Sequence, residues 1–187
     1  MKLKTFPLFK PYLTFVLDNR FRGLFDKVES HLKFMGVKPG MRVLEVGCAT
    51  GFVTSYLSNL VSGDGFVVSI DVQEKMIKKA KRKRGFLKNT DFRTESATDI
   101  KSVKDEEIDL VLLYFSFHEI SGKEDAVREF YRVLKPKGIL SIREPREEVL
   151  KKNRNAYWEY IEKHGFKPAF EAENCDAISC CLKFIKD

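Results

Sequence analysis

The sequence predicts an α/β domain built around a mostly parallel sheet, and three observations lead to this fold class. Segments with strand character alternate with segments of helical spacing along most of the chain, which is typical of a parallel sheet covered by helices. Residues 108–117, IDLVLLYFSF, are almost uninterrupted apolar sequence, as expected of a strand buried on both faces. Residues 43–51, VLEVGCATG, pass from an apolar run into a turn framed by two glycines.

The predicted elements follow one another in order. Strands are expected where short apolar or β-branched runs occur, at residues 42–46, 65–71, 91–96, 108–117, 138–144, 166–171 and 177–185. Helices are expected where apolar residues recur at helical spacing or where the sequence is strongly charged, at residues 52–60, 74–84, 124–135 and 155–165. The first of these helices is expected to place one set of apolar side chains on its buried face: Phe52, Tyr56, Leu57 and Leu60.

Helix ends are marked by small or rigid residues. Gly85 is expected to cap the helix at 74–84, and Gly165 to end the helix at 155–165. The stretch KPKG, with Pro136 and Gly138, is a stop signal after the helix at 124–135.

Residues 1–38 stand outside the alternation. A helical stripe of apolar residues runs through this segment, formed by Leu24, Phe25, Val28, Leu32 and Met35. We expect an N-terminal helical segment, residues 1–38, packed on a single domain of residues 39–187. Simple core packing and covering of the functional site are both open roles for this segment.

The composition is that of a globular protein, with 43% hydrophobic and 33% charged residues. The apolar runs are too short to span a bilayer, and the N-terminal stretch has no small-residue cleavage site. A cytoplasmic location is therefore expected. The net charge of +7 permits nucleic-acid binding without requiring it. The basic run 78–85, KKAKRKRG, is interpreted as a solvated helix end, with an RNA or acidic-partner surface as the alternative.

Four cysteines lie at positions 48, 175, 180 and 181. No C-x-x-C pair occurs, so a metal site is not expected. Free thiols are expected, with adjacent Cys180 and Cys181 on opposite faces of a strand.

The glycine-framed loop raises the question of which ligand it binds, because ligands of open α/β sheets lie at the carboxyl ends of the strands. A dinucleotide fingerprint is G-x-G-x-x-G, whereas here Gly47 and Gly51 are separated by three residues and Ala49 stands at the second glycine's place. Glu45 would repel a pyrophosphate, and no G-K-[ST] follows to form a phosphate-binding P-loop. S-adenosylmethionine fits better, because it has an ammonium and a sulfonium but no phosphate.

Each end of that cofactor has a candidate partner. Glu45 can favour the ammonium, and the loop amides can meet the carboxylate. Asp71 ends the second predicted strand and can accept hydrogen bonds from the ribose hydroxyls. An acidic residue at this place also serves NAD proteins, so Asp71 does not discriminate between the two cofactors.

Four segments together resemble class I S-adenosylmethionine-dependent methyltransferases of the broad small-molecule type that includes the ubiquinone/menaquinone C-methyltransferases. They are VLEVGCATG, VVSIDVQEKMIKKA, FHEISGKEDA and YRVLKPKGILSIREP. The resemblance covers roughly residues 36–187. It implies a doubly wound, Rossmann-like sheet of seven strands with the last strand antiparallel, and S-adenosylmethionine as the cofactor. The cofactor-binding residues that it implies are Glu45, Gly47, Cys48, Ala49, Thr50, Gly51, Asp71, Val72, Met76, Ser96, Ala97 and Phe115.

Two positions depart from the family pattern. Ala49 replaces the usual middle glycine of the loop, and its methyl group narrows the approach to the cofactor. Ser96 stands where the family often has an Asp that holds the adenine amino group. Ser96 can still form a hydrogen bond there, and the Ala97 amide can meet an adenine ring nitrogen.

Methyl transfer needs mainly the alignment of donor and nucleophile, with a base only where the nucleophile must lose a proton. His118, after the fourth predicted strand, is the candidate base; a histidine that only shapes the pocket is the alternative. Glu119 is expected to be structural, and Arg143 and Glu144 to face the site edge. Three aromatic residues are expected either to line a substrate pocket or to pack in the core: Tyr12, Tyr157 and Trp158.

The sequence therefore predicts a methyltransferase acting on a small molecule at oxygen, carbon or nitrogen. The alternatives are an RNA or protein methyltransferase using the basic surface, a non-catalytic S-adenosylmethionine-binding protein, and an NAD-dependent oxidoreductase. The loop after the fourth strand lacks the N/D-P-P-Y/F motif of enzymes that methylate DNA bases or amides. The acceptor and the oligomeric state do not follow from these residues.

Overall fold

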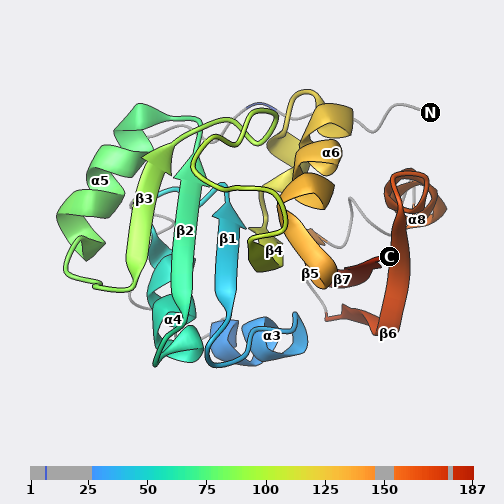
Figure 1. Ribbon diagram of the computed structural model, residues 1–187, viewed down its shortest axis with the longest axis horizontal. Helices are drawn as coiled ribbons and strands as arrows, with labels where there is room; N and C mark the ends of the chain where they lie inside the picture. Colours follow the sequence, from blue (N-terminus) through green and yellow to red (C-terminus); the bar gives the residue numbers. More distant parts are fainter. Residues whose placement is uncertain (1–6, 8–26, 146–153, 177–178) are drawn as a thin grey trace.

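A computed structural model describes residue 7 and residues 27–145, 154–176 and 179–187 (Figure 1). Its strands form one seven-stranded sheet in the order β3-β2-β1-β4-β5-β7-β6. Strands β1 to β5 pair in parallel, and β7 is antiparallel to both of its neighbours. The strands are β1 Arg42–Val46, β2 Phe66–Asp71, β3 Thr90–Thr94, β4 Ile108–Tyr114, β5 Leu134–Pro145, β6 Phe166–Cys175 and β7 Ser179–Lys186. The predicted fold class, including the antiparallel last strand, is confirmed.

Helices cover both faces of the sheet because the strands are apolar on both sides. Val43 of β1 and Leu110 of β4 belong to a core cluster with side chains of α3 and α4, whereas their neighbours Leu44 and Val111 pack in a second cluster with α6. The helical elements are α3 Val28–Phe34, α4 Phe52–Val61, α5 Glu74–Arg84, the short 3-10 helix η2 Phe117–Glu119, α6 Lys123–Val133 and α8 Arg154–Glu162.

Helix α4 buries a different face from the one predicted. Thr54, Leu57, Ser58 and Val61 are the buried residues, and the apolar side chains predicted beside Leu57 are only partly buried. Polar side chains are tolerated on this face because they have partners: the Ser58 hydroxyl donates to Asn89 Oδ1 at 2.5 Å.

The stretch KPKG was predicted to follow the helix as a stop signal, but it lies within the next strand. The helix ends at Val133, and β5 begins at once with Leu134, so Pro136 and Gly138 lie within the strand. The register of β5 on β4 shifts between Ile108 and Leu110, which accommodates the proline and its missing N–H donor.

The N-terminal stripe is seen in part. Val28, Leu32 and Met35 are buried against the sheet as predicted. Leu24, Phe25 and Tyr12 lie outside the described residues, and the boundary between residues 1–38 and 39–187 stays a prediction. Among the described residues, no helix is long and apolar enough to cross a membrane.

The prediction of four free thiols is wrong for two of them. Cys175 and Cys180 form a disulfide, because they face each other in the antiparallel register of β6 and β7. Cys48 and Cys181 are buried free thiols. Cys180 and Cys181 pack in different core clusters, as expected for neighbours on one strand. Within the described ranges, no group of three or more His, Cys, Asp or Glu residues is placed to bind a metal.

Candidate active site

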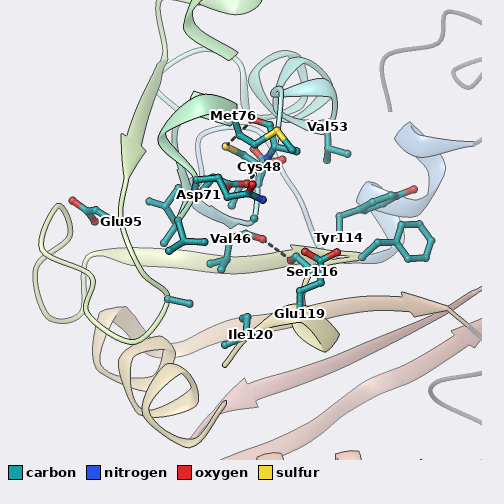
Figure 2. Close-up of a pocket in the computed structure, with 18 of the residues that line it drawn as sticks. Val46, Cys48, Val53, Asp71, Met76, Glu95, Tyr114, Ser116, Glu119 and Ile120 are labelled. Atoms are coloured by element: carbon teal, nitrogen blue, oxygen red, sulfur yellow. Dashed lines mark hydrogen bonds between the residues drawn. The ribbon is translucent and has the colours of Figure 1, made fainter. Parts of the chain in front are cut away.

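A cavity of about 450 Å³ opens at the carboxyl ends of β1, β2 and β4 (Figure 2). This volume is in the range of small-molecule sites. Figure 2 shows Asp71, Cys48 and Met76 grouped together, with Ser116 and Glu119 apart from them toward the end of β4. Except for Gly51, every residue predicted from the sequence to bind cofactor or to act in catalysis lines this cavity.

Gly47 allows the loop to pass close to the segment after β4. Its φ is +79°, and a Cβ added there would lie 2.5 Å from the Ser116 Cβ. The Ser116 hydroxyl donates to the Val46 carbonyl at 2.6 Å, which joins the ends of β1 and β4. A glycine is therefore required for both its conformation and its lack of a side chain.

The loop amides are largely satisfied within the protein. The N–H groups of Gly47 and Cys48 donate to the Ile70 carbonyl, and the Gly51 N–H donates to the Cys48 carbonyl. The Ala49 N–H donates to Asp71 Oδ2 at 2.9 Å. A cofactor carboxylate would have to compete with these bonds, and a contact between the loop amides and that carboxylate stays a prediction.

Ala49 has a φ of +48°, in the left-handed region that favours glycine. The family motif has glycine at the position of Ala49, and this left-handed backbone conformation is by itself a reason for that glycine. Gly51, with φ +78°, precedes α4, and a Cβ there would lie 3.0 Å from atoms of Arg84 and Phe92. Gly51 therefore packs against these side chains and does not line the cavity.

Glu45 is buried beneath the loop. Its Oε2 accepts hydrogen bonds from the hydroxyls of Thr54 at 2.5 Å and Ser69 at 2.7 Å. Burial raises the pKa of Glu45 to about 7, against the opposing effect of these two hydrogen bonds. The carboxyl group therefore gains negative charge readily when a cationic group approaches at neutral pH.

Asp71 is held by two backbone donors. Its Oδ2 accepts from Ala49, and its Oδ1 accepts from the Gln73 N–H at 2.8 Å. Burial raises the pKa of Asp71, and the two N–H groups oppose that rise. Each carboxylate oxygen keeps further lone-pair capacity, so Asp71 can accept ribose hydroxyls while it fixes the loop.

Beyond Asp71, the cavity wall contains both apolar and polar side chains. Met76 is buried and Val72 is largely exposed. The Ser96 hydroxyl is 2.7 Å from the Thr98 hydroxyl, so a hydrogen bond from Ser96 to a ligand would add to an existing contact. Glu95, which the sequence reasoning missed, also lines the cavity and accepts from the Ser102 hydroxyl at 2.8 Å.

Phe115 forms the wall at the end of β4 in an uncommon backbone conformation. Its φ is +59°, and its N–H donates to the Arg143 carbonyl at 2.7 Å. Its ring meets that of Tyr114 edge to face, with centroids 5.1 Å apart. A bulky residue with positive φ is strained and must be held by its surroundings.

His118 is oriented by a buried carboxylate. Its Nδ1 lies 2.5 Å from Glu144 Oε2, and the other Glu144 oxygen accepts from the Phe117 N–H at 2.8 Å. Its Nε2 lies 3.8 Å from Glu119 Oε1. Glu144 is fully buried, so it fixes the imidazole from behind, which is the arrangement of an orienting carboxylate in sites that use histidine as a base.

Comparisons with known proteins agree with this geometry. Residues 37–176 match the family described as "Methyltransferase domain". A crystal structure of a SAM-dependent methyltransferase from Aquifex aeolicus is 31% identical, with a TM-score of 0.81 over 95% of this chain and 99% of that one.

The chain belongs to the methyltransferase domain family.

Other relatives differ from this chain in length or in the activity that their names give. The ubiquinone/menaquinone biosynthesis C-methyltransferase of Shewanella oneidensis is 30% identical over 83% of this chain, which spans 64% of that relative's length. The [4+2]-cyclase SpnF is 20% identical with a TM-score of 0.70. This last likeness shows the fold alone, and fold does not fix function.

Family membership implies S-adenosylmethionine, and the cavity of the methyltransferase domain fits such a ligand. Four carboxylates line it, and none of its described lining residues is Lys or Arg: the acidic residues are Glu45, Asp71, Glu95 and Glu119. Such a cavity disfavours a phosphate and favours a cation.

Sequence reasoning missed several residues that line the cavity. Tyr114 and Ser116 flank Phe115, and Gln73 follows Asp71. Ser116 had a signal in the sequence, since it is the only hydroxyl side chain after Tyr114 in the apolar run 108–117. Trp158 does not line the cavity: its ring packs on Phe184 in the core, with centroids 4.8 Å apart. The side chain of Tyr157 lies outside the described residues.

Proposed function

We propose that this chain is an S-adenosylmethionine-dependent methyltransferase that acts on a small-molecule acceptor and uses His118 as its general base. The observation that carries the proposal is the single cavity that joins the acidic half at Glu45 and Asp71 to the His118–Glu144 pair. A cofactor half and an acid–base half that share one cavity are what transfer to a weakly acidic acceptor requires.

The cofactor half is proposed to hold S-adenosylmethionine through its charged and polar ends. Glu45 favours the ammonium, and Asp71 accepts the ribose hydroxyls. Met76, Val72 and Ala97, which line the cavity, would hold the adenine. S-adenosylmethionine, when bound, would supply a methyl group on a positively charged sulfur, which needs no further activation by the protein. The protein's task is therefore to align the acceptor and to exclude water.

His118 is proposed to take a proton from the acceptor at Nε2. Glu144 beside Nδ1 stabilises the imidazolium that results, because the carboxylate is buried and 2.5 Å away. Glu119, near Nε2, extends the acidic lining toward the acceptor. Phe115 and Tyr114 supply the apolar wall that keeps water from the reacting centre.

The acceptor class is supported by the relatives. The Shewanella protein is named a ubiquinone/menaquinone biosynthesis C-methyltransferase. A C–H acceptor must lose a proton during transfer, which gives His118 a task that an already nucleophilic nitrogen would not require. We therefore favour a small, acidic carbon or oxygen acceptor over an amine, and over RNA or protein.

Calorimetry with S-adenosylmethionine, S-adenosylhomocysteine and NAD tests the cofactor. We expect both adenosyl compounds to bind and NAD not to bind. Binding of NAD alone would overturn the assignment. Incorporation of label from methyl-labelled S-adenosylmethionine into cell extract then separates an enzyme from a non-catalytic binding protein.

The role of His118 is tested by His118→Ala with His164→Ala as the matched control. His164 lies outside the cavity, with its Nδ1 2.8 Å from the Tyr160 carbonyl. We expect His118→Ala to lower turnover by roughly 100-fold or more while S-adenosylhomocysteine affinity stays within twofold. Equal turnover in the two variants rules out a base at His118.

We also propose a cytoplasmic location for this reaction. The Cys175–Cys180 disulfide is uncommon for that compartment, so cell fractionation is the test. Recovery of the protein outside the cytoplasmic fraction would contradict the location and leave the reaction unaffected.

A further inference from the structure

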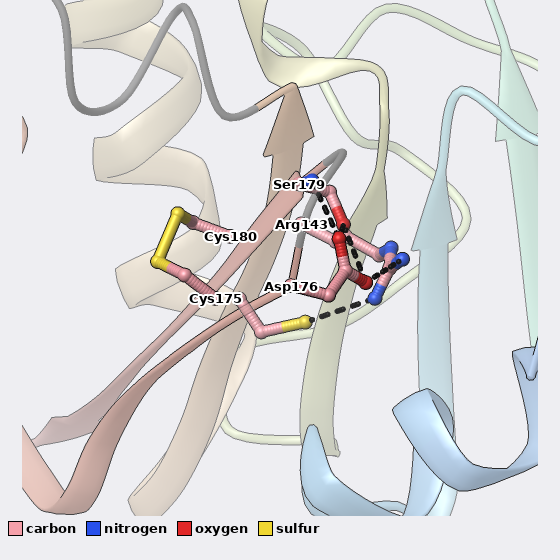
Figure 3. Close-up of a disulfide and its surroundings, with 6 residues drawn as sticks. Arg143, Cys175, Asp176, Ser179 and Cys180 are labelled. Atoms are coloured by element: carbon pink, nitrogen blue, oxygen red, sulfur yellow. Dashed lines mark hydrogen bonds and ion pairs between the residues drawn. A yellow bond between two sulfur atoms is a disulfide. The ribbon is translucent and has the colours of Figure 1, made fainter.

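A polar cluster lies behind the wall of the cavity, between β5 and the adjoining ends of β6 and β7 (Figure 3). Its centre is Arg143 of β5, which is only 3% exposed and does not itself line the cavity. A buried guanidinium needs partners to offset its lost hydration. Those partners connect the cavity wall to these strand ends.

On the cavity side, Arg143 supports two aromatic residues. Its guanidinium carbon lies 5.2 Å from the ring centroid of Tyr114 and 5.4 Å from that of Phe115, within the range of cation–π attraction. Its backbone carbonyl accepts the Phe115 N–H. Arg143 thus contacts Phe115 through both its main chain and its side chain, at a residue whose positive φ requires support.

On the far side, Asp176 holds the guanidinium. Asp176 Oδ2 lies 3.0 Å from Arg143 Nη2 and 3.4 Å from His31 Nε2. Cys181 Sγ accepts from Arg143 Nη1 at 3.5 Å. Figure 3 shows Asp176 between Ser179 and Arg143.

The position of Asp176 is fixed by its hydrogen bonds to Ser179. Its Oδ1 accepts from the Ser179 N–H at 2.7 Å, and its N–H donates to the Ser179 carbonyl at 2.9 Å. The disulfide joins the residues on either side of this pair, Cys175 before Asp176 and Cys180 after Ser179. Closing so short a segment covalently removes conformational freedom that the hydrogen bonds alone would have to overcome.

We propose that Arg143 is a positioning residue for the Tyr114–Phe115 wall, and that the Cys175–Cys180 disulfide sets its position through Asp176, so that cofactor affinity depends on the redox state of this pair. The proposal rests on the proposed function for the identity of the ligand. Beyond that function, it assigns a redox-dependent role to the ion pair between Asp176 and Arg143, which do not line the cavity.

Reduction requires a dithiol reductant. Its thiolate attacks the sulfur of Cys175, which is partly exposed, whereas Cys180 is fully buried. The S–S bond breaks, two electrons and two protons convert the cysteines to thiols, and the reductant becomes a disulfide. Asp176 is then held by its hydrogen bonds alone, and the contact with Arg143 weakens.

The experiment compares S-adenosylhomocysteine binding by oxidised protein and by protein reduced with dithiothreitol, using calorimetry. We expect the Kd to rise about two- to fivefold on reduction, the size of a cation–π contact, with the stoichiometry unchanged. A merely structural role would instead lower the stoichiometry and leave the Kd of the remaining sites unaltered.

Three variants complete the test. The double variant Cys175→Ser/Cys180→Ser should bind S-adenosylhomocysteine with the Kd of the reduced protein, and dithiothreitol should not change that Kd. Asp176→Asn should raise the Kd of the oxidised protein by a similar factor. Asp187→Asn is the control, because it removes a carboxylate paired with Lys167 at the end of the same hairpin. It should leave the Kd of the oxidised protein unchanged.

The possible failures are distinct. Equal affinity in the oxidised and reduced proteins overturns the redox dependence alone. Absence of binding in both states overturns the proposed function and, with it, this inference. A response of the double serine variant to dithiothreitol would also overturn it, since the effect would then come from elsewhere.

Discussion

Alanine at Gly47 should destabilise the protein more than alanine at Gly40, although both glycines have the same φ. Each has a φ of +79°. A Cβ at Gly40 would meet nothing within 4 Å, whereas a Cβ at Gly47 would lie 2.5 Å from the Ser116 Cβ and 3.0 Å from its Oγ. The pair therefore separates the cost of conformation from the cost of close packing.

The magnitudes follow from these contacts. Placing alanine in the left-handed region costs about 1–2 kcal/mol, and the stiffer unfolded chain returns about 0.4–1 kcal/mol. Gly40→Ala should therefore lower the free energy of unfolding by about 1 kcal/mol. Overpacking against Ser116 adds about 1–3 kcal/mol, so Gly47→Ala should lower it by roughly 2–4 kcal/mol.

Urea unfolding of the two variants and the parent protein measures these differences. Calorimetry with S-adenosylhomocysteine should also show weaker binding for Gly47→Ala and unchanged binding for Gly40→Ala, because only the first forces Ser116 and the loop apart. Losses of unfolding free energy that agree within about 0.5 kcal/mol would refute the packing argument.

Three further predictions concern the loop and its acids. Ala49→Gly should raise the free energy of unfolding by up to about 1 kcal/mol in urea titrations, because it relieves a left-handed alanine; a loss would contradict the conformational reason for glycine in the related motif. Glu45 is protonated up to about pH 7 when folded but ionises near its ordinary value of 4.5 when unfolded, so stability should fall as pH rises between these values, by about 3 kcal/mol. Glu45→Gln should flatten this dependence, measured by urea unfolding at pH 5 and pH 8, and an unchanged slope would show that other groups cause it. Glu144→Gln should lower kcat at least about tenfold with S-adenosylhomocysteine affinity within twofold, and equal kcat would remove Glu144 as the residue that orients His118.

The cofactor half of the site was predictable because its residues follow strand ends closely in the chain. Glu45 and Asp71 lie on adjacent parallel strands, and the carboxyl ends of such strands meet at one edge of the sheet. The sequence did not show the protonation behaviour of these two carboxyl groups. Burial raises the pKa of Glu45, and the hydroxyls of Thr54 and Ser69 oppose that rise, so the balance depends on contacts that form only in the folded protein.

The acid–base half was predicted only in part. His118 was expected at the site, but its partner Glu144 lies 26 residues away and was placed only at the site edge. The two meet because β4 and β5 are neighbours in the sheet. The side-chain orientation that brings Nδ1 to the carboxylate is set by packing around the short 3-10 helix.

The sequence by itself determined the α/β fold class and the position of the glycine-framed loop at the end of the first strand. These follow from local periodicity and from residue types at strand ends, which act over a few residues. Only the tertiary structure decided the Cys175–Cys180 disulfide, the buried face of α4 and the link from Asp176 through Arg143 to Phe115. Those depend on hairpin register and on which side chains meet across strands, where a shift of one residue would exchange the faces.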